Sequence, residues 1–188
     1  MSQTSPTYEY WPEGISQYGN LSGEALFAEL ATRAAATPDR CAIPSSGATY
    51  GELLDASQML AGYMQQRLGV RHGCSVLLAL DDCPQRAVAV FAVARCAARL
   101  VAFDPGRTAG DIATGAAGSG ARAAIVTAAS LPTLAPLLDD GTLYGCVLCG
   151  GAPVHPALHD FAGALSAGIA PLPLNYPLDT WSTKHELA

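Results

Sequence analysis

Apolar residues recur at helical spacing in the first part of the chain. From Gly23 onward they fall three or four positions apart, and the following Pro38 predicts that this helix ends before the proline. Thr49 and Glu52 have capping-box spacing, in which each side chain bonds the other residue's backbone N–H. Apolar residues then occupy one face of the next segment, and Gly69 is placed to cap this second helix.

After Gly69 the pattern changes, and short apolar runs alternate with helical segments. Runs of strand length are predicted at 75–80, 100–103, 123–127 and 143–149, and helices at 87–98, 109–117, 131–138 and 158–165. Strands that alternate with helices of this size form a parallel sheet covered on both faces. We therefore predict a three-layer α/β/α fold with a mainly parallel sheet.

The chain divides into three predicted parts. Tyr, Pro, Gly and Ser are frequent in residues 1–22, which predicts an extended N-terminal arm. Residues 23–170 carry the alternating pattern, and residues 171–188 form a Pro-rich C-terminal tail. A chain of 188 residues buries roughly 70% of its unfolded surface, so this single domain can hold a core without disulfides or metals.

Charged side chains are sparse. They make up 14% of the residues, against about 25% in a typical domain, and the formal net charge is −6. Little polar material is left for the outside, so we expect some apolar surface to meet a partner. The acidic balance, without a cluster of Lys and Arg, argues against nucleic acid. No secretory signal is visible and no apolar run reaches the roughly 18 residues of a membrane span, so a cytoplasmic protein is expected.

The six cysteines are expected to be reduced thiols that pack as small hydrophobic residues. Cys146 and Cys149 form a C-x-x-C pattern, but it lies in a strand-like run. Side chains three positions apart on a strand point to opposite faces, so the two thiols are not expected to share a metal ion.

Six short segments occur in a definite order along the chain. They are Trp11–Gly14 (WPEG), Leu26–Ile43 with its PDRCAI exit, Thr49–Leu53 (TYGEL), Ala61–Gly73, Asp104–Pro105 and Ser119–Ala121. Together they resemble the AMP-forming acyl-CoA synthetases of the adenylate-forming superfamily, and more narrowly the long-chain fatty acid ligases. The resemblance implies the flavodoxin-like half of that family's N-terminal domain. In full-length members it implies ATP, Mg²⁺ and CoA.

The family's phosphate-binding loop has no counterpart in these residues. In the family, a stretch like Pro171–Trp181 leads into S-G-T-T-G-x-P-K, whose backbone amides and lysine hold the ATP phosphates. Here Lys184 is the only lysine, and its surroundings, STKHELA, contain no glycine. We expect a truncated synthetase-like chain that binds no cofactor and does not adenylate alone. It would act as a homodimer or with a second protein chain, or as one chain of a split ligase.

Polar residues at the predicted strand ends offer an alternative function. Ligands of open parallel sheets bind outside the carboxyl ends of the strands. Four residues are expected there, with His155 nearby: Asp81, Asp82, Cys83 and Asp104. A helix N-terminus favours the thiolate of Cys83, which could pair with His155 as nucleophile and base in a small standalone enzyme or ligand-binding protein. The competing interpretation makes Asp82 an N-cap and Cys83 a packed residue.

Several other positions are interpreted as structural. His72 is expected in a turn, and His159 and His185 at the surface. The pair Gly150–Gly151 lacks the G-x-G-x-x-G frame and is also interpreted as a turn. Ala97 stands where the resembling family usually has glycine, at a position with a turn or packing role.

Overall fold

Five parallel strands form one sheet in the computed structural model, which describes residues 23–103 and 109–173. The strands are β3 (Ser75–Ala79), β4 (Arg99–Ala102), β5 (Ala121–Thr127), β6 (Gly145–Cys149) and β7 (Leu158–Asp160). Their order across the sheet is β4-β3-β5-β6-β7. The second strand of the sheet thus lies outside the first, and the later strands add on the other side, which is the flavodoxin-like order.

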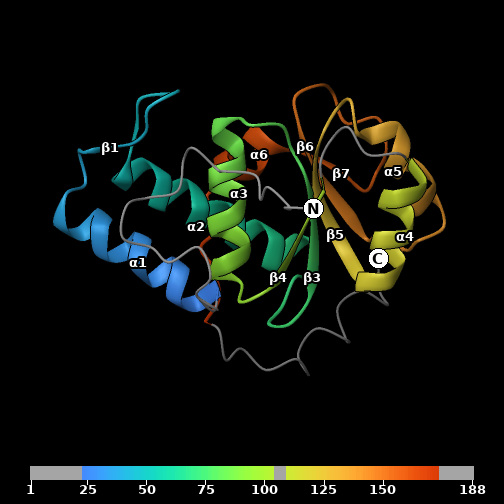
Figure 1. The fold of residues 1–188 in the computed structure, drawn as a ribbon, viewed down its shortest axis with the longest axis horizontal. Coiled ribbons are helices and arrows are strands. Elements are labelled where there is room, and N and C mark those ends of the chain that lie inside the picture. Colours follow the sequence, from blue (N-terminus) through green and yellow to red (C-terminus); the bar gives the residue numbers. More distant parts are fainter. Residues whose placement is uncertain (1–22, 104–108, 174–188) are drawn as a thin grey trace, which may run out of the picture.

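Helices cover both faces of this sheet, which confirms the predicted three-layer α/β/α fold (Figure 1). One face carries α2 (Tyr50–Arg67), α3 (Pro84–Arg95) and α6 (Phe161–Ser166), and the other carries α4 (Ala109–Ser119) and α5 (Leu131–Asp139). Helix α1 (Gly23–Ala36) packs on α3 and α2. The predicted arm and most of the predicted tail lie outside the described residues.

The termini of α2 follow the local signals in the sequence. Thr49 Oγ1 accepts a hydrogen bond from the Glu52 N–H at 3.2 Å, and Glu52 Oε2 accepts one from the Thr49 N–H at 2.9 Å. The predicted capping box is therefore present. At the other end Leu68 is the C-cap, and Gly69 follows it with a φ of +66°, a conformation that glycine adopts without strain.

Three short strands depart from the sequence prediction. The segment between α1 and α2 forms an antiparallel hairpin of β1 (Cys41–Ile43) and β2 (Ala48–Thr49), which was not predicted. The predicted helix at 158–165 begins only at Phe161, because the three residues before it pair with β6 as β7. Asp160 ends that strand and caps α6, since its Oδ2 accepts from the Gly163 N–H at 2.6 Å.

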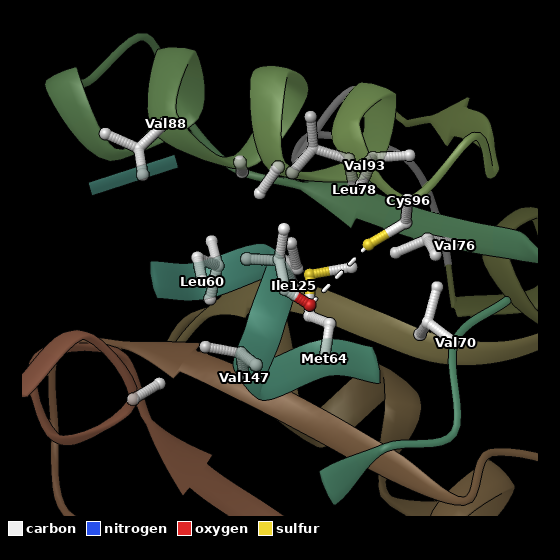
Figure 2. Close-up of a cluster of buried hydrophobic side chains, with 14 of the residues drawn as sticks. Leu60, Met64, Val70, Val76, Leu78, Val88, Val93, Cys96, Ile125 and Val147 are labelled. Carbon is white, nitrogen blue, oxygen red and sulfur yellow. Dashed lines mark hydrogen bonds between the residues drawn. The ribbon is translucent and has the colours of Figure 1, made fainter. Parts of the chain in front are cut away.

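The apolar core has one part on each face of the sheet. Figure 2 shows the larger part, where Leu60 and Met64 of α2 meet Val76 and Leu78 of β3. The smaller part lies beneath α4 and α5. Cys146 belongs to the smaller part whereas Cys149 packs against the larger one, so the two thiols face opposite sides of the sheet as predicted.

Ala97 adopts a left-handed backbone conformation in the turn from α3 to β4, with a φ of 49°. This conformation costs an L-residue about 1–2 kcal/mol, part of which is offset in glycine by its greater freedom when unfolded. Ala97→Gly is therefore expected to raise the free energy of unfolding by about 0.5–1 kcal/mol. Urea denaturation checks this. The control Ala92→Gly lies within α3 and should lose stability, so a loss in both variants would contradict the prediction.

Candidate functional site

The candidate site lies at the carboxyl edge of the sheet, near the switch point between β3 and β5. The chain leaves β3 through Asp81 and Asp82, whose side chains are exposed, and then enters α3. Arg86 in the first turn of α3 donates from Nη1 to the Leu80 carbonyl at 3.0 Å, which ties this loop to the helix. The edge therefore presents two carboxylates to solvent, while Arg86 is engaged by a backbone oxygen.

Cys83, and not Asp82, is the N-cap residue of α3. Its backbone is extended and its side chain makes no capping hydrogen bond, because it packs against the core instead. The interpretation of Asp82 as the N-cap is thus wrong, whereas the packed position of Cys83 agrees with the structural interpretation. Asp104, the remaining acidic candidate, lies outside the described residues.

The thiol of Cys149 is a neighbour of Cys83 that the sequence did not point to. Burial, followed by the nearby charges of Cys83 and Asp160, raises the pKa of Cys149 to about 12. Both cysteines pack against the larger part of the core. The sequence feature that could have pointed to this pair is position. Cys83 follows one strand of the parallel sheet, and Cys149 ends another.

His155 contacts residues other than Cys83. Its Nδ1 accepts from the Ala157 N–H at 3.1 Å, and its Nε2 lies 3.6 Å from Asp139 Oδ1. In the described part of the chain, no hydrogen bond joins His155 to Cys83. The nucleophile and base pair therefore stays a prediction that these contacts do not support.

Besides His155, the described residues include two histidines, one in a turn and one in a half-buried position. His72 lies in an exposed turn, as predicted. His159 was expected at the surface, which is wrong: it is half-buried, and its Nδ1 lies 2.8 Å from the Tyr63 hydroxyl. Burial, followed by the charge of Arg67, lowers the pKa of His159 below its usual 6.5. His185 lies outside the described residues, and the pair Gly150–Gly151 forms an exposed bend after β6.

Residues 23–103 and 109–173 contain neither a candidate metal site nor a membrane-spanning helix. No group of three or more His, Cys, Asp or Glu side chains there could hold a metal ion. None of the helices in these ranges is long and apolar enough to cross a membrane.

Comparison with known proteins places this fold in a family. The family model for AMP-binding enzymes matches residues 30–144, which include α2, α3 and the first three strands of the sheet. The chain belongs to the AMP-binding enzyme family. No curated protein matches it. The family match ends immediately before β6, so β6, β7 and α6 lie beyond the matched residues.

Three solved structures resemble this AMP-binding family member. MbtA of Mycobacterium smegmatis in its apo form is 27% identical with a TM-score of 0.71, over 81% of this chain and 29% of that chain. The anthranilate CoA ligase AuaEII in complex with anthranoyl-AMP is 19% identical, with a TM-score of 0.69 over 77% and 28%. A benzoate CoA ligase of Burkholderia xenovorans is 21% identical, with a TM-score of 0.68 over 81% and 30%. This chain thus spans less than a third of each of these proteins.

Proposed function

We propose that residues 23–170 act as the N-terminal α/β unit of an adenylate-forming acyl- or aryl-CoA ligase, which works with further polypeptide and does not adenylate alone. The observation that carries this proposal is the family match over residues 30–144. The flavodoxin-like sheet that the chain shares with CoA ligases supports it. The further polypeptide can belong to the same chain or to another.

The charges at the carboxyl edge support the non-catalytic part of the proposal. Stabilising a transferring phosphoryl or adenylyl group needs cationic or N–H donors aimed at it. The β3 loop instead presents the carboxylates of Asp81 and Asp82, and Arg86 is directed to a backbone carbonyl. The single lysine of the sequence, Lys184, has no glycine-rich loop around it. The proposed unit therefore contributes scaffold and contact surface to the ligase.

The exposed surface of the described residues carries few large apolar side chains. Within the described residues, the exposed large hydrophobic side chains are Met59, Tyr144 and Val154. Many other exposed positions are alanine or glycine, which explains how few charges coexist with a covered core. A partner of this unit would meet mainly small and polar side chains.

The function is tested with the purified 188-residue chain. Incubated with ATP, Mg²⁺ and either benzoate or a fatty acid, it is expected to release no pyrophosphate above the protein-free background, because it supplies no phosphate-binding loop. The benzoate CoA ligase of Burkholderia xenovorans provides the positive control in the same assay. Turnover by the 188 residues alone would contradict the non-catalytic part of the proposal.

A further inference from the structure

One short stretch of α2 holds the whole C-terminal part of the described chain. Tyr63 contacts His159 of β7, as described above. Three further contacts join α2 to the segment after α6: Gly62 lies beneath the Ile169 and Ala170 carbonyls, Gln66 Nε2 donates to the Ala170 carbonyl at 2.7 Å, and Gln65 Oε1 accepts from the Leu172 N–H at 2.6 Å. Residues 62–66 are thus a receptor surface for residues 158–172, which we name the C-terminal latch.

The latch also contacts β6, α3 and the apolar core. Its strand β7 is only three residues long and pairs with β6 on one side. Leu158, Phe161 and Ala164 contribute its buried apolar side chains. Arg95 of α3 donates from Nη2 to the Leu172 carbonyl at 3.3 Å. A short strand at the edge of a sheet opens at a lower free energy than the central strands, and β7 is such a strand.

His159 is the titratable group at the contact between the latch and α2. Its ring meets the Tyr63 ring edge to face, with centroids 5.6 Å apart. From α2, the charged or titratable groups that face it are Tyr63 and Arg67. From β6, Gly145 approaches its Nε2 and carries no side chain, and α6 has no titratable residue. The neighbouring carboxylate, Asp160, caps α6.

A proton on His159 would therefore be poorly accommodated while the latch is docked. In the docked latch the imidazolium would be half-buried and near the guanidinium of Arg67, and both conditions disfavour its positive charge. Release of the latch exposes the ring to water and removes both penalties. These two causes agree with the lowered pKa of His159. A folded-state pKa below the unfolded value means that the stabilisation is present above about pH 6.5 and is lost as the pH falls.

We propose that residues 158–172 form an acid-released latch, in which protonation of His159 frees β7, α6 and the following segment from α2 as one unit. Release exposes the edge of β6 and the surface of residues 62–66. The latch lies beyond the family-matched residues 30–144, and the proposal goes beyond the proposed function because it concerns how this segment is held and released.

Amide hydrogen exchange of the full chain tests the latch, with protection factors measured at about pH 7 and pH 5 and corrected for intrinsic exchange rates. Because opening of the latch is coupled to the uptake of one proton, the equilibrium constant for opening can rise by at most about tenfold for each unit that the pH falls. We expect the protection of peptides within 158–172 to fall at least about threefold relative to peptides of β3 and β5. Equal protection at both pH values would overturn the proposal.

Three histidine variants identify the trigger. His159→Gln is expected to abolish the pH dependence, whereas His72→Gln and His155→Gln should keep it. Loss of protection that persists in His159→Gln would overturn the assignment. Should that variant dock poorly at every pH, NMR titration of the unsubstituted chain decides: the opening midpoint must coincide with the titration of His159 and not with that of His72 or His155.

Discussion

Replacing Gly62 by alanine is expected to lower the free energy of unfolding by about 1–3 kcal/mol, the usual cost of overpacking a filled site. Within a helix, Gly→Ala normally raises the free energy of unfolding by about 0.5–1 kcal/mol, so the change expected at Gly62 has the opposite sign. A Cβ at residue 62 would overlap the Ile169 carbonyl oxygen and come within 2.7 Å of the Ala170 carbonyl carbon. Backbone atoms cannot rotate away, so the segment after α6 must move off α2.

Urea denaturation of Gly62→Ala against the unsubstituted chain measures this loss. Gly118→Ala is the matched control, since Gly118 also lies in a helix, in α4, and a Cβ there meets nothing within 4 Å. The control should be neutral or slightly stabilising. If Gly62→Ala proved as stable as the control, the close approach of the Ile169 carbonyl to α2 would be wrong.

Elements with strong local signals could be predicted from the sequence. The Thr49 and Glu52 capping box formed as expected because both partners lie within one turn of the chain. Strand β7 was missed for the opposite reason. Its three residues, Leu158 to Asp160, adjoin a helical segment, and only pairing with β6 makes them a strand. That pairing is a tertiary contact that local spacing does not encode.

In the candidate site, likewise, some features could be predicted from the sequence and others could not. Asp81, Asp82 and Cys83 could be placed at the carboxyl edge because they directly follow a predicted strand of a parallel sheet. The partners of the histidines could not be predicted. Tyr63 and His159 are 96 positions apart and meet only because α2 packs over the edge of the sheet. His155 is likewise placed beside Asp139 by the connection between β6 and β7.

The low charge of the sequence led us to expect some apolar surface that meets a partner. Low charge fixes how many ionic groups reach the surface, but it does not decide what replaces them. Here exposed alanines replace many of them, as at Ala28, Ala36, Ala102, Ala128, Ala129 and Ala152. A methyl group adds little apolar area, so the surface is weakly charged without being strongly hydrophobic.

Stability is expected to fall steeply between about pH 9 and pH 12, because Cys96 and Cys146 are buried thiols. Burial raises the pKa of each from 9.0 to about 12. Cys96 lies inside the larger part of the core, with its Sγ 3.7 Å from the Ala61 carbonyl oxygen (Figure 2). Below pH 9 both thiols are neutral in either state, so their contribution is intact. Above pH 9 only the unfolded chain releases these protons, which favours unfolding.

The magnitude follows from proton linkage. Each thiol that ionises only on unfolding lowers the free energy of unfolding by about 1.4 kcal/mol per pH unit. Cys96 and Cys146 together contribute a slope of about 2.7 kcal/mol per pH unit in this window, and Cys149, whose pKa is also raised to about 12, adds about 1.4. Urea midpoints measured at intervals across the window provide the slope. The double variant Cys96→Ala with Cys146→Ala should remove about two thirds of it and leave the part that Cys149 contributes. This variant starts from a lower stability because two side chains have been truncated. Cys41→Ala, at an exposed position, should leave the slope unchanged. An undiminished slope in the double variant would assign the alkaline loss to groups other than these two thiols.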